Sequence, residues 1–255
     1  MQIAGSKAIV TGGASGMGRH FVLSLAKGGA DVAFCDLNAD GIAAVEAECA
    51  ELPGNVQGFE CNVADEESVV TFTKSAHAAM GGLNVLVNNA GIFRDGLLVK
   101  KDKETGEVKK MSLRKWQSVI DVDLTGPFLM TREFAANCIE NGTRSAVVVN
   151  ISSIARHGNR GQTNYSAAKA GLVADTKLWS VELSRYGIRT GAIAPGFVDT
   201  PILQGMPEGV LEAMVKPVPL RRVGTPDEIW LGVKFIIECD YFTGRCIDID
   251  GGMVV

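Results

Sequence analysis

The chain has 255 residues, of which 46% are hydrophobic and 21% are charged, and its formal net charge at pH 7 is −4. The lysines and arginines are scattered, and the densest basic stretch, Lys100–Lys110, also contains acidic residues, which argues against a surface for nucleic acid or an anionic membrane. No apolar run reaches the roughly 20 residues of a membrane-spanning helix, so we expect neither nucleic acid nor membrane as a partner.

The cysteines, at positions 35, 49, 61, 138, 239 and 246, form no Cys-x-x-Cys pair and have no histidine at the spacing of a zinc site. We therefore expect no metal, and free thiols in a reducing compartment. The first residues run directly into a predicted strand and lack the pattern of a signal peptide, so the expected location is the cytoplasm.

Short apolar runs alternate along the chain with longer amphipathic stretches. The runs predict strands at Lys7–Val10, Asp31–Cys35, Val56–Cys61, Val85–Val87, Ala146–Ile151, Arg189–Ile193 and Cys246–Ile249. The stretches between them predict helices near 16–28, 39–51, 65–80, 112–139, 164–186 and 225–239. Predicted helix N-caps stand at Asn38, Asp65, Ser112 and Thr225.

Strands that are apolar throughout, alternating with helices, are typical of a parallel sheet covered on both faces. Right-handed crossovers then give a doubly wound, Rossmann-type layout. Because we find no internal repeat, low-complexity tract or linker, residues 1–255 are predicted to form a single α/β domain.

Two segments interrupt the alternation. Residues 102–110 are polar around a central Thr-Gly and predict an exposed hairpin or loop. Residues 200–224 contain four prolines and predict a lid over a ligand site, because loops of this length are usually functional. Apolar residues within this predicted lid indicate a partly apolar pocket; they are Ile202, Leu203, Met206, Leu211 and Met214.

A glycine-rich turn, Thr11–Gly18, follows the first strand, with Gly12, Gly16 and Gly18 spaced G-x-x-x-G-x-G. Glycine lets the chain turn tightly and lets a pyrophosphate approach the backbone, where the start of a helix attracts the anion. In the first strand-to-helix turn of a doubly wound sheet, this pattern predicts a dinucleotide site.

Asp36 ends the second predicted strand, where a carboxylate accepts hydrogen bonds from the adenosine ribose hydroxyls and repels a 2′-phosphate. Ser15, inside the glycine loop, offers no positive charge to such a phosphate. Arg19 is the nearby cation that complicates this prediction. We therefore predict NAD rather than NADP as the cofactor.

Tyr165 and Lys169 lie four residues apart in a helical stretch, so both side chains occupy one face of the helix. A free phenol has a pKa of about 10, and a neighbouring ammonium lowers that value toward the range of a general acid or base. Ser152, thirteen residues before Tyr165, offers a hydroxyl to the same substrate oxygen. The arrangement predicts acid–base chemistry at an alcohol or carbonyl.

Together these features resemble the short-chain dehydrogenase/reductase family over essentially the whole chain. The motifs that carry the resemblance occur in the family's order; they are Thr11–Gly18, Asn88–Gly91, Ser152 with Tyr165 and Lys169, Pro195–Gly196, and Gly244–Gly252. The resemblance implies that Tyr165 exchanges the proton with substrate. It also implies that Ser152 orients the substrate oxygen and that Lys169 lowers the tyrosine pKa and holds the nicotinamide ribose.

The resemblance further implies a set of residues around the cofactor. They are Gly12, Ser15, Gly16, Met17, Gly18, Asp36, Leu37, Asn62, Val63, Asn89, Ala90, Gly91, Tyr165, Lys169, Pro195, Gly196, Val198 and Thr200. It also implies a small-molecule substrate and a homo-oligomer, tetramer or dimer, through the two longest helices.

Two positions depart from the family. Asn62 stands where the family usually has aspartate, and we expect a small effect. Asp123 stands where the family usually has an asparagine that stabilises a helix distortion and a proton relay through the lysine. A carboxylate there is expected to raise the pKa of Lys169 and to weaken its effect on Tyr165.

Three functions therefore remain open. The first is an NAD(H)-dependent secondary-alcohol dehydrogenase or ketone reductase. The second is a 3-oxoacyl-thioester reductase, although versions of that enzyme in fatty-acid synthesis generally prefer NADPH. The third is an NAD-binding protein whose turnover is impaired because Asp123 replaces the family asparagine.

Overall fold

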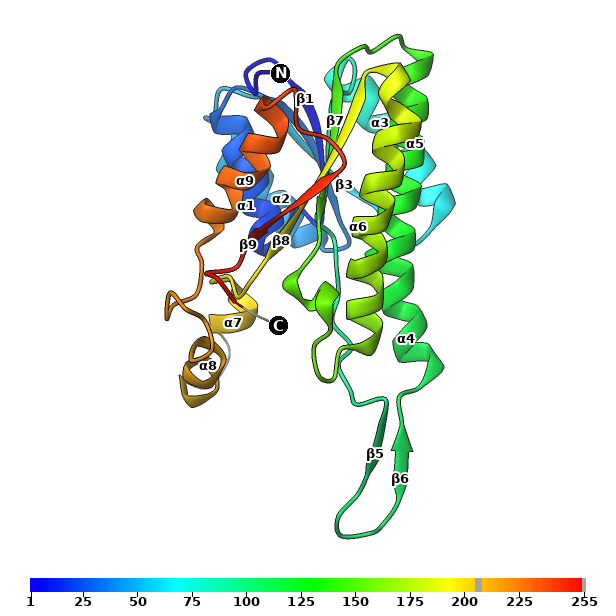
Figure 1. Ribbon diagram of the computed structural model, residues 1–255. Coiled ribbons are helices and arrows are strands. Elements are labelled where there is room, and N and C mark those ends of the chain that lie inside the picture. Colours follow the sequence, from blue (N-terminus) through cyan, green and yellow to red (C-terminus); the bar gives the residue numbers. More distant parts are fainter. Residues whose placement is uncertain (205–207, 254–255) are drawn as a thin grey trace.

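A central sheet of seven parallel strands organises the part of the chain that the computed structural model describes, residues 1–204 and 208–253 (Figure 1). The strand order is β3-β2-β1-β4-β7-β8-β9. Their bounds are β1 Lys7–Thr11, β2 Asp31–Asp36, β3 Val56–Glu60, β4 Val85–Asn88, β7 Ala146–Ile151, β8 Ile188–Pro195 and β9 Arg245–Ile249. The predicted doubly wound α/β fold is confirmed, and all the predicted strands are present.

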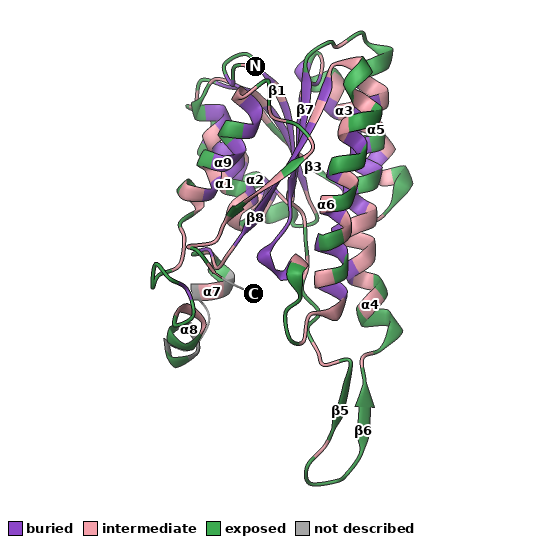
Figure 2. Ribbon diagram, in the orientation of Figure 1, coloured by how far each residue is buried: buried purple, intermediate pink, exposed green. Residues whose placement is uncertain are grey.

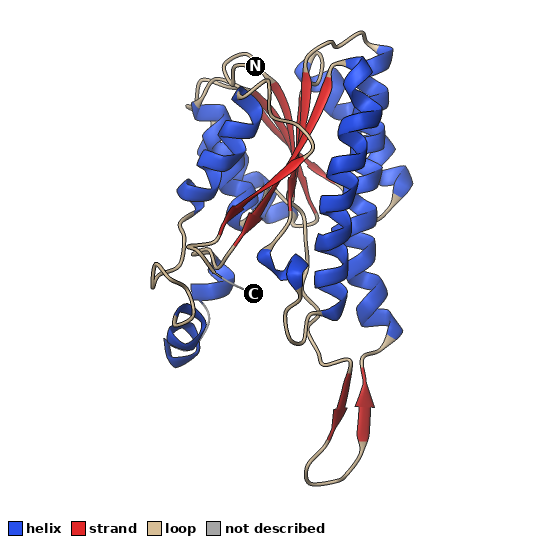
Figure 3. Ribbon diagram, viewed as in Figure 1, coloured by secondary structure: helices blue, strands red, loops and turns tan. Residues whose placement is uncertain are grey.

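Helices cover both faces of the sheet (Figure 3). One face of the sheet carries α1 (Gly16–Lys27), α2 (Ala39–Cys49) and α9 (Pro226–Glu238). These helices and the strand residues that face them form one core cluster. The other face carries α3 (Glu66–Met80), α5 (Gly126–Glu140) and α6 (Thr163–Leu183). The sheet therefore has no solvent-facing side, which explains why its central strands are apolar throughout.

Burial is concentrated in the sheet and on the inner faces of the helices (Figure 2). Every residue of β4 and β7, the strands at the centre, is buried. Phe21 of α1 and Phe134 of α5 are fully buried on opposite faces of the sheet. Burying one such side chain stabilises the fold by roughly 2–3 kcal/mol.

Helix starts follow the predicted caps. The side chains of Asn38, Asp65, Ser112 and Thr225 each accept a hydrogen bond from a backbone N–H of the first turn of their helix. Thr225 and Glu228 form a reciprocal capping box at the start of α9. Each cap satisfies an N–H group that the helix itself leaves without a partner.

The helix predicted at 112–139 is continuous but irregular. It comprises α4 (Leu113–Ile120), a π-helical turn (Asp121–Thr125) and α5. Single π-helical turns inside α-helices often mark functional sites. Periodicity alone does not reveal such a turn, because one extra residue shifts the pattern without breaking it.

The predicted hairpin is present and begins earlier than expected, with β5 (Val99–Lys101) pairing antiparallel with β6 (Val108–Lys110). It projects beyond α4, away from the sheet (Figure 1). The predicted lid contains two short helices, α7 (Pro201–Gln204) and α8 (Glu208–Val215). Met206, which the sequence assigned to the lid's apolar residues, lies outside the described residues.

Candidate active site

The carboxyl ends of the parallel strands meet at one edge of the sheet, where ligands bind in open α/β folds. The predicted site residues follow β1, β2, β3, β4, β7 and β8 at this edge, and α6 lies beside it. Within the described residues 1–204 and 208–253, no cluster of His, Cys, Asp and Glu could hold a metal ion, and no helix is long and apolar enough to cross a membrane.

Glycine is required at two positions of the loop between β1 and α1. Gly12 has φ +66°, and a Cβ there would lie 2.9 Å from the Cα of Ala90. A Cβ on Gly18 would lie 2.0 Å from the carbonyl oxygen of Gly12. Ser15 precedes α1 without a side-chain cap, so the first N–H groups of the helix remain available to an anion.

The glycine loop is fixed to the end of β4. The backbone N–H groups of Asn89 and Ala90 each donate to Thr11 Oγ1 at 3.0 Å, and Asn89 Nδ2 donates to the Thr11 carbonyl at 3.0 Å. Asn89 and Ala90 thus hold the glycine loop by direct contact. Gly16 and Met17 begin α1 from this loop.

Asp36 lies at the end of β2 and faces the glycine loop. Its carboxylate accepts hydrogen bonds from the N–H groups of Ala14 (3.1 Å), Leu37 (2.8 Å) and Asn38 (3.1 Å). Arg19, the cation that complicated the cofactor prediction, forms an ion pair with Glu48. The carboxylate of Asp36 is therefore not neutralised by Arg19 and retains acceptor capacity.

Three of the predicted cofactor residues, Leu37, Asn62 and Val63, differ in exposure. Val63 is buried against Gly126, while Asn62 and Leu37 are exposed. The Asn62 side chain accepts a hydrogen bond from Ala64 N–H at 3.1 Å, which fixes the turn after β3. An asparagine performs this local role as well as an aspartate does.

Four of the predicted cofactor residues lie at or just after the end of β8: Pro195, Gly196, Val198 and Thr200. Gly196 N–H donates to the Ile249 carbonyl at 3.0 Å, directly after Pro195. Val198 is buried and pairs with Gly224 in an isolated parallel bridge, which joins the two ends of the predicted lid. Thr200 precedes α7 and accepts from Leu203 N–H at 2.9 Å.

Tyr165 and Lys169 occupy one face of α6, as predicted. Their side chains are nearly buried, and Lys169 Nζ lies 5.4 Å from the centroid of the Tyr165 ring. The ring of Phe93, which the sequence did not indicate, packs against Tyr165 at a centroid distance of 4.7 Å. The phenol is thus held in place from two sides.

Two adjacent serines, Ser152 and Ser153, follow β7. The hydroxyl of Ser152, the predicted catalytic serine, donates to the Lys169 carbonyl at 2.9 Å. The hydroxyl of Ser153 accepts from Ala155 N–H at 3.1 Å, and the Ser153 side chain also acts to lower the pKa of Tyr165. Ser153 is therefore a second candidate for the serine that contacts the substrate oxygen.

Asp123 lies in the π-helical turn and has no exposed surface. Its Oδ2 is 3.2 Å from Lys169 Nζ, and its Oδ1 accepts from Ile92 N–H at 2.9 Å. Lys169 Nζ also donates to the Ile151 carbonyl at 3.1 Å. A Cβ on Gly91 would lie 2.8 Å from Asp123 Oδ2, so glycine makes room for the carboxylate.

This ion pair sets the charges around the phenol. Burial acts to lower the pKa of Lys169, but the Asp123 carboxylate and Tyr165 outweigh it and leave that pKa raised, as expected. Burial raises the pKa of Tyr165, Lys169 acts to lower it, and Asp123 raises it again. Lys169 therefore acts on the tyrosine pKa in the expected direction, but burial, the largest cause, together with Asp123 outweighs it and leaves the pKa of Tyr165 raised.

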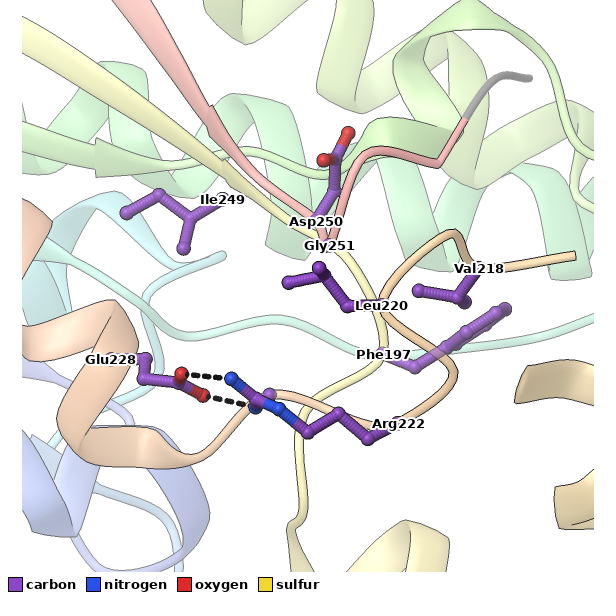
Figure 4. A pocket seen from close by; sticks show the side chains of 9 residues that line it. Phe197, Val218, Leu220, Arg222, Glu228, Ile249, Asp250 and Gly251 are labelled. Carbon is purple, nitrogen blue, oxygen red and sulfur yellow. Dashed lines mark hydrogen bonds and ion pairs between the residues drawn. The ribbon is translucent and has the colours of Figure 1, made fainter. Parts of the chain in front are cut away.

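A small cavity of about 100 Å³ lies at the base of the predicted lid (Figure 4). Phe197, Val218 and Leu220 line it, and an ion pair between Arg222 and Glu228 closes one side. Because Glu228 also caps α9, the ion pair fixes the end of the lid to that helix. The cavity is far smaller than a dinucleotide, and we interpret it as part of the lid's anchorage.

The residues at the sheet edge fit a dinucleotide. The glycine loop, where a Cβ on Gly12 or Gly18 would clash, and the uncapped start of α1 would hold the pyrophosphate. The carboxylate of Asp36, which contacts this loop, would accept from the ribose hydroxyls. Tyr165 and Lys169 lie at the same edge of the sheet, where Lys169 Nζ contacts the end of β7.

Comparisons with known proteins agree with this geometry. A family model described as Enoyl-(Acyl carrier protein) reductase matches residues 12–254. The 3-oxoacyl-[acyl-carrier-protein] reductase FabG of Thermotoga maritima is 37% identical over 258 residues, which cover 100% of both chains. The (3R)-3-hydroxyacyl-CoA dehydrogenase of Canis lupus familiaris is 35% identical and covers 99% of this chain and 98% of its own.

A solved structure from Sinorhizobium meliloti, described as a short-chain alcohol dehydrogenase, is also similar. It superposes with a TM-score of 0.86 at 27% sequence identity and covers 98% of this chain and 97% of its own.

Removing Lys169 tests the ion pair. We expect Lys169→Met to destabilise the protein by about 3–5 kcal/mol at pH 8, because it leaves a buried carboxylate without a counter-ion. Burial already raises the pKa of Asp123. A raised carboxyl pKa penalises the folded state at high pH, so the loss should shrink as pH falls toward about 4, the value in an unfolded chain.

The measurement is the free energy of unfolding in denaturant at pH 8 and pH 5. The matched control is the double variant Lys169→Met/Asp123→Asn, which should recover most of the loss at pH 8. A double variant that is no more stable than Lys169→Met would contradict this account of the pair.

Proposed function

The chain belongs to the short-chain dehydrogenase/reductase family of oxidoreductases, and we propose that it interconverts a secondary alcohol and a ketone with NAD(H). The observation that carries the proposal is the placement of Tyr165 and Lys169 on one buried face of α6, with Lys169 Nζ 5.4 Å from the Tyr165 ring and bonded to the end of β7. A phenol beside a cation, with a serine hydroxyl nearby, suits a carbonyl oxygen that gains a proton.

The nicotinamide group, when bound, supplies or accepts the hydride. In the reducing direction, the Tyr165 hydroxyl donates its proton to the carbonyl oxygen, and the Ser153 hydroxyl donates a hydrogen bond to the same oxygen. Lys169, held by Asp123 and the Ile151 carbonyl, stabilises the phenolate that remains. The raised pKa of Tyr165 keeps the phenol protonated at neutral pH, which is the form that donates in the reducing direction.

Asp36 supports NAD over NADP as the cofactor. Its carboxylate ends β2 beside the glycine loop, and the nearby cation Arg19 is paired with Glu48. A 2′-phosphate would face a negative charge without a compensating cation from Arg19.

A 3-oxoacyl thioester is the substrate class that the relatives favour. The Thermotoga maritima relative is named for a 3-oxoacyl substrate on a carrier protein, and the Canis lupus familiaris relative for a 3-hydroxyacyl-CoA. Both substrates carry a secondary alcohol or a ketone at the reacting carbon. The predicted lid, residues 200–224, with its apolar residues, is consistent with an acyl chain.

The impaired NAD-binding protein is the second candidate. The buried carboxylate of Asp123, in ion-pair contact with Lys169, favours it because both burial and this charge oppose ionisation of Tyr165. The two candidates share the dinucleotide site and differ in turnover.

One experiment separates the candidates. Purified protein is assayed with NADH and with NADPH on acetoacetyl-CoA, a cyclic ketone and a sugar ketone, with Tyr165→Phe as the matched control. We expect turnover with NADH on the thioester that Tyr165→Phe abolishes while NADH binding persists. Tight NADH binding without turnover on any ketone would favour the impaired protein, and turnover that survives in Tyr165→Phe would refute the acid–base assignment.

A homo-oligomer remains part of the proposal. Phe128 and Ile139 of α5, and Leu178 and Val181 of α6, are exposed on the outer faces of these helices. Apolar side chains gathered on two neighbouring helices support association through them, since a monomer would leave them in water.

The two adjacent serines give a direct test of the proposed role of Ser153. Ser153→Ala should lower kcat about 10²-fold, because it removes a hydrogen bond to the oxygen that gains charge in the transition state. Ser152→Ala, the matched control, should keep its turnover and lose about 1 kcal/mol of stability from the bond to the Lys169 carbonyl. The reverse ranking of the two kcat values would restore Ser152.

Cofactor choice is tested at Asp36. Asp36→Asn keeps an acceptor oxygen and removes the charge, so the ratio of kcat/KM with NADPH to that with NADH should rise about tenfold, equivalent to about 1.4 kcal/mol of relieved repulsion. Asp31→Asn removes the same charge from the opposite end of β2 and should leave the ratio unchanged. A wild-type preference for NADPH would overturn the NAD assignment.

A further inference from the structure

Phe93 presents an apolar ring beside the acid–base site. Its ring centroid lies 4.7 Å from that of Tyr165, and the two rings are tilted by 41°. Although Phe93 contacts this nearly buried phenol, 43% of its own surface is exposed. Tyr165 also belongs to a small apolar cluster of buried residues with Val119, Ala155 and Ala168. The Phe93 ring therefore extends the apolar surroundings of the phenol to the surface of the protein.

The backbone after Phe93 is tied to the helix that carries the phenol. Asn164 Nδ2 donates to the Arg94 carbonyl at 3.2 Å. Asn164 has no exposed surface, and its Oδ1 accepts the N–H of Tyr165 at 2.9 Å. One buried side chain thus contacts both the residue after Phe93 and the residue whose ring Phe93 covers, so the two rings keep their relative position.

The segment around Phe93 is fixed at two further points. Before Phe93, the N–H of Ile92 donates to Asp123 Oδ1 at 2.9 Å. Three residues after it, the N–H of Gly96 donates to the Gly161 carbonyl at 2.8 Å. A single exposed phenylalanine on a loop is ordinary and carries no function by itself. A ring whose backbone is fixed on both sides, and which contacts the proton-donating phenol, is a permanent wall of the site.

Any substrate of Tyr165 must place its carbonyl close to this wall. An oxygen that takes a proton from the phenol lies about 2.7 Å from the hydroxyl oxygen, so the carbonyl carbon and its two substituents lie beside the Tyr165 ring. A substituent on the Phe93 side meets an apolar surface. An alkyl or aryl group there leaves water and gains contacts, whereas a hydroxyl group loses its bonds to water and finds no equivalent partner on the ring.

We propose that Phe93 is a specificity-determining residue, which selects ketones with an alkyl or aryl group next to the carbonyl over polyhydroxy ketones. The inference rests on the proposed acid–base role of Tyr165 and names the substrate class for it. A 3-oxoacyl thioester meets the requirement, because its ketone carbon carries an alkyl group on one side. A sugar ketone, with hydroxyl-bearing carbons on both sides, does not.

The first experiment compares kcat/KM for cyclohexanone and for dihydroxyacetone, with NADH or NADPH, whichever supports turnover. We expect the wild type to prefer cyclohexanone. The ratio of the two values should fall about tenfold in Phe93→Ala and about threefold in Phe93→Leu, which keeps an apolar group but loses the ring.

Phe235→Ala is the matched control for this comparison. Phe235 is 46% exposed on α9 and packs against another ring, that of Phe242, at a centroid distance of 5.3 Å. Its removal should leave the substrate ratio unchanged. A wild-type preference for dihydroxyacetone, or an equal loss on both ketones in Phe93→Ala, would overturn the inference, because a merely structural role lowers both values together.

The second experiment needs no turnover. Protein with ring-carbon-labelled phenylalanine and tyrosine is titrated with cyclohexanol or with glycerol, with and without NADH, and followed by NMR. The chain has ten phenylalanines, so Phe93→Leu assigns the signal of Phe93. Cyclohexanol should shift the signals of Phe93 and Tyr165 together, and glycerol at the same concentration should leave them in place. A Phe93 signal that cyclohexanol does not move would contradict the inference.

The outcomes are separable. Turnover that depends on Tyr165, with a substrate ratio that Phe93→Ala leaves unchanged, would refute the role of Phe93 and leave the proposed function standing. Protein that turns over no ketone but shows the paired shifts would refute the proposed turnover and leave Phe93 as the apolar wall of the ligand site. If Phe93→Ala fails to fold, Phe93→Leu and the NMR titration of the wild type decide.

Discussion

The buried ion pair between Asp123 and Lys169 is the interaction on which the chemistry of the site depends. Two charges leave water at a high cost, and such a pair persists only where further hydrogen bonds satisfy its remaining atoms. Here the N–H of Ile92 serves the carboxylate and the carbonyl of Ile151 serves the ammonium. Tyr165 stands beside this pair, so its proton affinity is the balance of burial, one cation and one anion.

The surrounding backbone is shaped around that carboxylate. Asp123 enters the site from a π-helical turn, and Gly91, at the end of the Asn88–Gly91 motif, leaves the space that its oxygen occupies. The same motif ties the glycine loop to β4 through Asn89. One short segment therefore contacts both the predicted pyrophosphate site and the acid–base site.

Much of this arrangement can be predicted from the sequence, because it follows from periodicity and caps. Strand positions, helix starts and the shared face of Tyr165 and Lys169 all depend on local rules that the chain obeys. Spacing to Tyr165 does not distinguish Ser152 from Ser153, because adjacent residues of an extended backbone point to opposite sides. The net rise of the Tyr165 pKa could not be predicted from the sequence, because burial is a property of the packed chain, as is the ring of Phe93 against Tyr165.

Direct titration of the Tyr165 phenol tests the central claim that burial and Asp123 outweigh Lys169. The chain has three tyrosines, so ring-carbon labelling and NMR resolve them, and Tyr165→Phe assigns the signal. The account predicts a pKa above the ordinary value of about 10 for Tyr165 in the free protein, and a lower value in Asp123→Asn. A pKa below 10 in the wild type that Asp123→Asn leaves unchanged would contradict it.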